Sequence, residues 1–328
     1  MGLGPPTLVA GKSPTRDSRR RCGGGILATM IVSASYRTDI PAFYATWFLK
    51  RFRAGYAKVV NPYGRQVHTV ALRAGVDGFV FWTRNVGPFL GALAEVRRAG
   101  LPFVVQYTVT GYPRALESSV IEAERSLDLM AEVAAAHGRR AVVWRYDPIM
   151  VSSLTPASWH EDNFSRLAGR LEGVVDEVVI SFANIYRKTQ RNVAAAARAH
   201  HFDWCDPPAE DKTTLATRLA VAAAACGMAL TVCSQPEYTV AGSEGARCVD
   251  ARRLEAVAAG WGTLRPVRAR PKGNRPGCFC FESRDIGDYD TCPHGCTYCY
   301  AVNSRTLAKR RFHLHDPEGE FLFPPASP

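Results

Sequence analysis

A group of cysteines near the C-terminal end has the residue type and the spacing that binding of a metal cluster requires. Five of the ten cysteines fall between positions 278 and 299. Cys292, Cys296 and Cys299 have the spacing C-x3-C-x2-C, and Cys278 and Cys280 precede them. Thiolates are soft ligands, and three of them on one tight loop can each bind a different iron of a 4Fe–4S cluster. The fourth iron would then have no local cysteine and would be open to a substrate or another ligand.

A structural zinc site is the alternative for these cysteines. Zinc prefers four closed ligands, commonly supplied as C-x2-C pairs or completed by histidine. The spacings C-x-C and C-x3-C-x2-C fit that habit poorly, although His294 lies inside the loop and could serve as a ligand. We therefore expect one 4Fe–4S cluster on Cys292, Cys296 and Cys299.

The stretch CPHGCTYCYA, about ten residues from Cys292 to Ala301, resembles the cluster loop of radical S-adenosylmethionine (SAM) enzymes. Its CxxxCxYCYA form is the one found in spore photoproduct lyase and its relatives. The resemblance implies SAM at the open iron and an external electron donor such as ferredoxin or flavodoxin. Tyr298 and Tyr300 are candidate cofactor-binding residues. The chain has no Gly-Gly-Glu-like motif for SAM, so the alternative is a non-SAM enzyme whose open iron acts as a Lewis acid or sulfur acceptor.

A longer similarity covers about residues 30–316. It rests on IVSASYRTDIPAFY, FWTRN, TGYPR, WRYDPI and the C-terminal CFCFESRDIGDYDTCPHGCTYCYA. In these stretches the chain is similar to a bacterial family known only as a domain of unknown function. The resemblance implies a barrel-like α/β body with a C-terminal iron–sulfur tail, which we place at 266–328.

The elements that must position these side chains alternate between apolar strands and amphipathic helices. Strands are expected at 31–35, 78–83, 103–108, 141–146, 177–182 and 229–233, with an extra hairpin at 58–60 and 67–72. Helices are expected at 41–54, 87–99, 114–137, 158–172, 188–201 and 209–227. This alternation favours a TIM-like (β/α) barrel, complete or partial, over residues 30–265. A doubly wound open sheet is the alternative, although its Gly-rich dinucleotide turn is missing.

Functional groups of such barrels lie where the strands end. The candidate catalytic residues at these ends are Arg37, Asp39, Tyr107, Arg145 and Asp147, and the candidate cofactor-binding residues are Trp82 and Gln106. The two arginines could bind a carboxylate or phosphate, and the two aspartates could orient them or move protons. The alternative is that each arginine forms a buried ion pair with the aspartate two positions later and ties loops together.

Four further cysteines could bind a second cluster. Cys233 ends a predicted strand, and Cys248 follows what could be a seventh strand. Cys278 and Cys280 are one residue apart, a spacing at which an extended chain points both thiols to the same side. These four thiolates would close a cluster and leave no open iron. The alternative is a single cluster with the other cysteines unused.

The composition narrows the function classes. Cysteines that cluster late in a chain of 328 residues indicate metal ligands in a reducing, cytoplasmic compartment. No apolar run is long enough for a membrane span. The net charge of +11 allows an anionic or nucleic-acid-derived substrate, or a nucleic-acid-binding protein with structural cysteines, but an ordinary solvated basic surface also explains it and is favoured. Residues 1–29, rich in Gly, Pro and Arg, are expected to be disordered.

Overall fold

A sheet of eight parallel strands lies at the centre of this computed structural model, which describes residues 30–325. The predicted extension at 1–29 lies outside the described residues. The strands are β1 (Met30–Ala34), β4 (Val76–Thr83), β5 (Phe103–Thr108), β6 (Val142–Ile149), β7 (Glu177–Phe182), β8 (Ala229–Val232), β9 (Ser243–Gly245) and β10 (Ser283–Asp285). Their order in the sheet is β10-β1-β4-β5-β6-β7-β8-β9. The predicted α/β fold with a parallel sheet is therefore confirmed.

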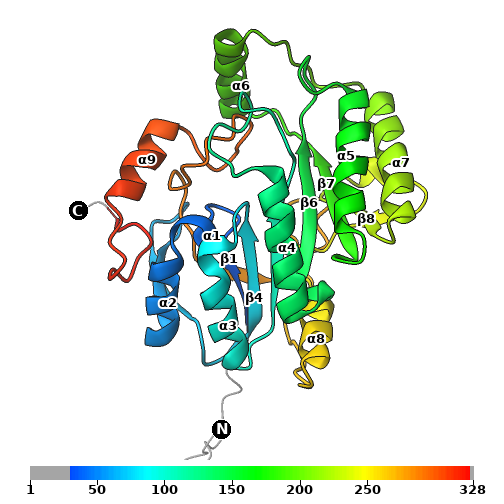
Figure 1. Cartoon of the computed structure of the whole chain (residues 1–328). Helices are drawn as coiled ribbons and strands as arrows, with labels where there is room; N and C mark the ends of the chain where they lie inside the picture. The colour runs from blue at the N-terminus through cyan, green and yellow to red at the C-terminus, as the bar shows by residue number, and fades with distance from the viewer. Residues whose placement is uncertain (1–29, 326–328) are drawn as a thin grey trace, which may run out of the picture.

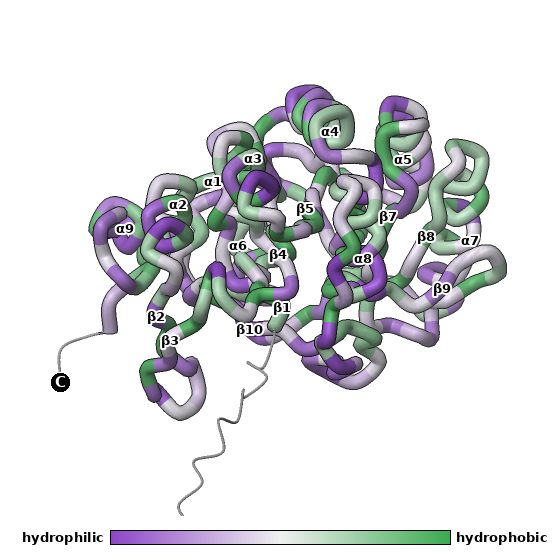
Figure 2. The backbone as a smooth tube through the Cα atoms, turned by 90° about the horizontal axis from the view of Figure 1, so that it is seen from below, coloured by the Kyte–Doolittle hydropathy of each residue, from purple (hydrophilic) through white to green (hydrophobic). Residues whose placement is uncertain are grey.

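Parallel strands need crossover connections, and most of these connections are helices. The helices cover the sheet, so the strand residues are buried on both faces. In β4, seven of the eight residues are buried, as the apolar run at 78–82 predicts for a strand covered on both faces. Figure 2 shows α2, α3, α4, α5 and α7 as an arc outside the strands. The strands predicted at 103–108 and 177–182 have the observed bounds, and the others differ by a few residues.

Strand β10 was not predicted. It comes from the stretch 266–328, which the sequence suggested was a separate tail, and it pairs with β1 in parallel. Its three residues, Ser-Arg-Asp, have no apolar pattern that could reveal a strand. The cysteine-rich part of the chain is therefore attached to the sheet itself.

The two outer strands of the sheet do not pair with each other. Within residues 30–325, β9 and β10 end the strand order on opposite sides. The segments beside them do meet, because the backbone N–H of Phe281 donates to the carbonyl of Val249 at 2.9 Å. The sheet is thus open between β9 and β10 and bridged there by a backbone hydrogen bond.

Nine α-helices accompany the sheet in the described part of the chain. They are α1 (Ile40–Phe43), α2 (Ala45–Ala54), α3 (Leu90–Arg98), α4 (Ala123–His137), α5 (Ala157–Leu171), α6 (Arg187–His200), α7 (Ala209–Ala225), α8 (Ala251–Gly260) and α9 (Arg305–His313). The helix expected at 114–137 begins only at Ala123. Residues 114–122 instead form a loop whose Glu117 is buried. None of the helices within 30–325 has the length and apolar character that crossing a membrane requires.

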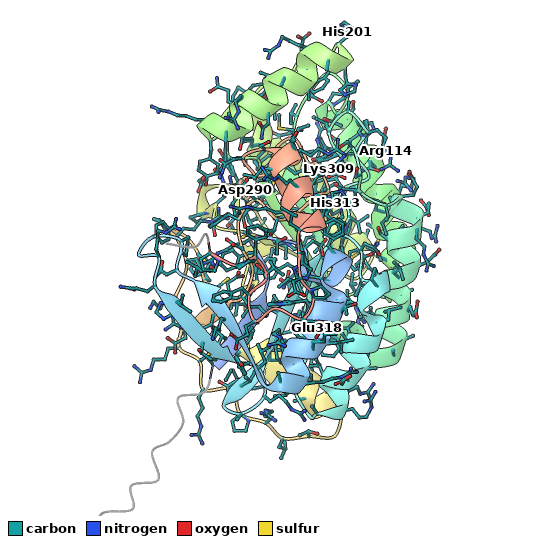
Figure 3. The ribbon with its side chains drawn as sticks, turned by 90° about the vertical axis from the view of Figure 1, so that its left-hand side faces the viewer. Arg114, His201, Asp290, Lys309, His313 and Glu318 are labelled. Carbon is teal, nitrogen blue, oxygen red and sulfur yellow. The ribbon has the colours of Figure 1, made fainter. Side chains whose placement is uncertain are left out.

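The predicted hairpin is present, and the C-terminal segment packs beside it. Strands β2 (Tyr56–Val60) and β3 (Val67–Ala71) pair antiparallel. The backbone N–H of Lys58 donates to the carbonyl of Glu320 at 2.9 Å. Figure 3 labels Lys309 and His313 on α9 and Glu318 in the segment that follows. This segment ties the C-terminal part of the chain to the N-terminal half.

Candidate functional site

The segment 286–301, called the cysteine loop below, crosses the C-terminal ends of the first strands (Figure 1, orange). The hydroxyl of Tyr44 donates to the carbonyl of Thr291 at 2.6 Å. His294 Nε2 lies 2.8 Å from Asp39 Oδ2. These contacts join the loop to the residues that follow β1, so the three clustered cysteines lie at the end of the sheet where barrel enzymes carry their functional groups.

Gly295 permits the tight approach of the cysteine loop to its neighbours. Its φ is +77°, and a Cβ at this position would lie 2.5 Å from Ser118 Oγ and 2.6 Å from Arg305 Nε. A side chain would therefore clash in addition to being strained. The glycine lets the loop turn between the first two cysteines of the motif, Cys292 and Cys296.

Cys292, Cys296 and Cys299 converge. All three line the same two cavities, of about 270 and 220 Å³. Burial raises the pKa of each thiol, to about 12 for Cys296, and the charge of Asp39 raises that of Cys292 further. The backbone N–H of Ala301 points at the Cys299 sulfur, at 3.4 Å. Buried thiols of this kind become thiolates when a metal displaces their protons, and N–H donors stabilise cluster-bound sulfur.

The described side chains include no preformed site for a single metal ion. Across residues 30–325, no three His, Cys, Asp or Glu side chains are grouped as one ion requires. No zinc site built on His294 is preformed among these residues: its Nε2 is bonded to Asp39, and its Nδ1 lies 3.5 Å from the carbonyl of Ser119. A 4Fe–4S cluster holds its thiolates farther apart than one ion does, so it is compatible with this spacing.

The cavity of about 220 Å³ lies between the cysteine loop and the strand ends, and we call it the strand-end cavity. Its walls include Arg37, Trp82, Arg145 and Asp147 from the strand ends, and Tyr298 and Tyr300 from the cysteine loop. Asp39 lines it too, so the structure brings together seven of the residues predicted from sequence, next to three predicted metal ligands.

Arg145 is fully engaged within the protein. Its Nε and Nη2 donate to the two oxygens of Asp147 at 2.9 and 2.6 Å. Its Nη1 lies 3.1 Å from Gln106 Oε1 and 3.0 Å from the Cys248 sulfur. The guanidinium also lies 5.0 Å from the centre of the Trp82 ring. These contacts support the ion-pair interpretation, because no nitrogen of Arg145 remains free for a bidentate bond to a ligand.

Arg37 does not pair with Asp39 as the alternative interpretation supposed. Its partner is Asp285 of β10, at 3.8 Å, and its Nη1 lies 3.5 Å from the carbonyl of Gly287. The guanidinium lies over the ring of Tyr289, 5.4 Å from its centre. Among the described residues, its buried Nε has no hydrogen-bond partner. That nitrogen is also the one nearest Asp285, so Arg37 contributes positive charge to the wall of the strand-end cavity while it is paired with Asp285.

Asp39 holds the local structure together. Its oxygens accept from the backbone N–H of Ala42 at 2.9 Å, which caps α1, and from that of Arg84 at 2.8 Å. They also accept from the hydroxyl of Thr83 at 2.8 Å and contact His294. Four contacts occupy the carboxylate, so its position favours a role in orienting the cysteine loop over the predicted proton transfer.

Tyr107 and Gln106 lie behind the cavity. Tyr107 is completely buried in the core, and its hydroxyl is 3.5 Å from the backbone N–H of Val86. It does not line the strand-end cavity, so the structure does not bring it to the other candidate residues. Gln106 is buried too, and its Nε2 donates to the carbonyl of Cys248 at 2.9 Å. Gln106 supports Arg145 from behind.

One buried network beside the cysteine loop was missed. Glu117 accepts from Arg84 at 2.7 Å and from Thr110 at 2.7 Å, and it is also bonded to the hydroxyl of Tyr298. Arg84 donates to the same hydroxyl at 2.7 Å. Glu117 was missed because it lies in the stretch expected to be helical. Arg84 could have been predicted from the sequence, since it directly follows the end of β4, where functional side chains were expected.

Asp285 is the second missed group. It accepts from the hydroxyls of Ser33 and Ser35 at 2.7 and 2.6 Å, and from the backbone N–H groups of Tyr36 and Gly287, both at 3.0 Å. Burial raises the pKa of its carboxyl. Its strand was not predicted, although its sequence lies inside the long cysteine-containing stretch similar to the uncharacterised family.

The other four predicted cysteines also come together. Cys233 follows β8, Cys248 follows β9, and Cys278 and Cys280 precede β10; all four line one cavity of about 390 Å³, the four-thiol cavity. A hydrogen bond from the Cys280 thiol lowers the pKa of Cys278 to about 6. The pKa of Cys280 is raised to about 11, because its bond to Cys278 and its burial outweigh the bond from Cys248.

Comparisons with known proteins give one family and weak structural likenesses. The family model described as "Domain of unknown function (DUF1848)" matches residues 31–301. No curated protein matches the chain. Two solved structures of D-hydantoinase, the first from Bacillus sp. AR9, are 12% and 10% identical, with TM-scores of 0.28 and 0.30. The alignments cover 58% and 73% of this chain, which spans 38% and 45% of the hydantoinases.

Proposed function

The chain belongs to the DUF1848 family, and we propose from this premise and from the site that it is an iron–sulfur enzyme. Cys292, Cys296 and Cys299 would hold one 4Fe–4S cluster, with its fourth iron open toward the strand-end cavity. One observation carries the proposal. The loop that bears these three thiols is hydrogen-bonded to the strand ends, and it encloses with Arg37 and Asp147 a cavity of about 220 Å³.

When bound, such a cluster accepts one electron and binds a ligand at its open iron, as in the enzymes that cleave SAM. The protein's own residues would bind and orient the substrate. The guanidinium of Arg37 lines the cavity and would attract an anionic group, and the rings of Trp82, Tyr298 and Tyr300 offer flat walls. The hydroxyl of Tyr298 is fixed by Arg84, so its ring keeps one orientation.

The finer features of the fold belong to the same proposal. The sheet would be a TIM-like barrel. Its closure would come from the hydrogen bond between Phe281, which precedes β10, and Val249, which follows β9. The protein would work in the cytoplasm, where cysteine ligands stay reduced. Its substrate would be a small or nucleic-acid-derived molecule with an anionic group, and its electrons would come from a ferredoxin or flavodoxin.

The first experiment measures iron after anaerobic reconstitution. The variant C292A/C296A/C299A should lose about four irons per chain and the matching part of the visible sulfur-to-iron absorbance. C205A is the control, because Cys205 is exposed and lies outside both cysteine groups; it should keep all the iron. A triple variant that keeps the wild-type iron, or a wild-type protein that binds stoichiometric zinc and no iron, would contradict the proposal.

The second experiment asks whether SAM is the ligand. Reconstituted protein is reduced with dithionite and incubated with SAM, and 5′-deoxyadenosine is measured. Its formation, lost in C292A/C296A/C299A, supports the radical SAM form. A stable cluster without this product favours the form in which the open iron acts as a Lewis acid or sulfur acceptor. Nucleic-acid binding that is salt-dependent and unaffected by loss of iron would favour the structural alternative.

A further inference from the structure

We propose that Cys233, Cys248, Cys278 and Cys280 bind a second iron–sulfur cluster, in which this chain supplies a thiolate to every iron. The proposal does not depend on the first cluster, because none of the four thiols belongs to the cysteine loop. Four thiolates at one cavity are the complete ligand set of a 4Fe–4S cluster.

Backbone hydrogen bonds bring three of these thiols together. The Cys248 sulfur lies 3.5 Å from the Cys233 sulfur. The backbone N–H of Val249 points at the Cys280 sulfur, at 3.4 Å, and Phe281 N–H donates to the Val249 carbonyl at 2.9 Å. The chain before β10 is thus held against the chain after β9. The closeness of the thiols is therefore built into the bridge between the two outer strands.

Gly277 brings the fourth thiol to the same place. Its φ is +71°, and a Cβ there would lie 2.9 Å from the Pro236 ring and 3.5 Å from the carbonyl carbon of Ser234. The loop that carries Cys278 therefore lies directly on the residues that follow Cys233. A larger residue than glycine could not make this approach without moving one of the two segments.

The site also contains the positive charge that a cluster with four thiolates requires. Arg145 Nη1 lies 3.0 Å from the Cys248 sulfur, and Arg275 Nη2 lies 3.7 Å from the Cys233 sulfur. Asp147 is paired with Arg145. A cluster with four thiolates carries net negative charge, and cations and N–H donors beside its sulfurs stabilise that charge in a buried site.

A cluster suits the arrangement better than one metal ion or a disulfide. The sulfurs of Cys233 and Cys248 lie 3.5 Å apart, and Cys278 and Cys280 reach the same cavity from the chain before β10. In residues 30–325 no group of three ligands suits a single ion. A disulfide would use only two of the four thiols, whereas the cavity of about 390 Å³ provides space beside all of them.

The second cluster would border the same ligand space as the first. Tyr36, Trp82, Tyr298 and Tyr300 line both the strand-end cavity and the four-thiol cavity. With all its irons bound by thiolates, the second cluster would offer no position to a substrate and would accept and pass on single electrons.

Iron content and spectroscopy test the proposal in the full chain. After anaerobic reconstitution we expect about eight irons per wild-type chain. We expect about four in C292A/C296A/C299A and about four in C233S/C248S/C278S/C280S. The cluster that remains in the triple variant should have an EPR signal that SAM does not change, because it has no open iron. Circular dichroism and thermal melting establish that each variant is folded.

The outcomes separate the two sites. A folded quadruple variant that keeps all the wild-type iron overturns the second cluster, and so does a folded triple variant that binds no iron or only zinc. The first cluster is tested independently by the triple variant, whose iron content should fall from about eight to about four per chain. Should the quadruple variant fail to fold, the single variant C278S decides, because Cys278 is half-buried. It should bind fewer irons than the wild type, and an unchanged iron content overturns the proposal.

Discussion

His294 and Asp39 are hydrogen-bonded, with 2.8 Å between Nε2 and Oδ2, although they lie 255 positions apart in the chain. Asp39 also caps α1 and accepts from the backbone of Arg84. The pair therefore connects the cysteine loop to the ends of β1 and β4. It leaves the Nδ1 atom of the histidine, which lies 3.5 Å from the carbonyl of Ser119.

His294→Gln should keep the iron of the protein and lower its stability. The histidine is buried and orients the loop, so we expect the free energy of unfolding to fall by about 1–3 kcal/mol. Urea denaturation and iron analysis measure the two effects. His313→Gln is the control, because His313 is exposed and should change neither. A folded H294Q protein without metal would show that His294 is a ligand.

Arg84→Met should be strongly destabilising, because it leaves the buried carboxylate of Glu117 without its charged partner. Loss of one partner of a buried pair costs about 3–5 kcal/mol. The double variant R84M/E117L should recover part of this loss, since no unpaired charge remains. Arg170→Met is the matched control, because its ion pair with Glu124 is exposed and should contribute at most about 1 kcal/mol. Losses that add in the double variant would contradict the coupling.

Asp285→Asn should weaken the attachment of β10 to β1. The amide can accept at one oxygen only, whereas the carboxylate accepts from Ser33, Ser35 and two backbone N–H groups. We expect a loss of about 1.5–3 kcal/mol in the free energy of unfolding, measured by denaturation. The control is the exposed Asp128→Asn. Equal stability of the two variants would exclude a structural role for Asp285.

The stability of the protein should decrease below pH 6.5 through His160. This histidine is buried between the Tyr146 hydroxyl and the Met150 carbonyl, and burial lowers its pKa to about 4. The unfolded chain, with a histidine pKa of about 6.5, binds the extra proton first. The free energy of unfolding therefore falls by up to about 1.4 kcal/mol per pH unit between pH 6.5 and 4.

Urea denaturation at several pH values compares the wild type with His160→Gln. The variant should be less stable at pH 7, and its loss of stability on acidification should be smaller by about the slope given above. His200→Gln, at an exposed site, should keep the wild-type slope. An identical slope in H160Q and the wild type would assign the acid sensitivity to other groups.

The sequence by itself determined the parallel α/β architecture, the family and the two groups of cysteines. The strands at 103–108 and 177–182 were recognisable because buried parallel strands are continuous apolar runs. The family match over residues 31–301 confirms the similarity seen in the sequence motifs. Iron binding by Cys292, Cys296 and Cys299 stays a prediction, although the structure does place these thiols together.

Only the tertiary structure decided the partners of the charged residues. Spacing suggested that Arg37 pairs with Asp39. In the folded chain Arg37 pairs with Asp285, and Asp39 is hydrogen-bonded to His294. Local patterns encode which side of a strand or helix is buried, because neighbours along the chain share that geometry. Partners about 250 positions apart leave no such periodic trace. Their pairing arises when β10 docks beside β1 and carries the cysteine loop to the strand ends.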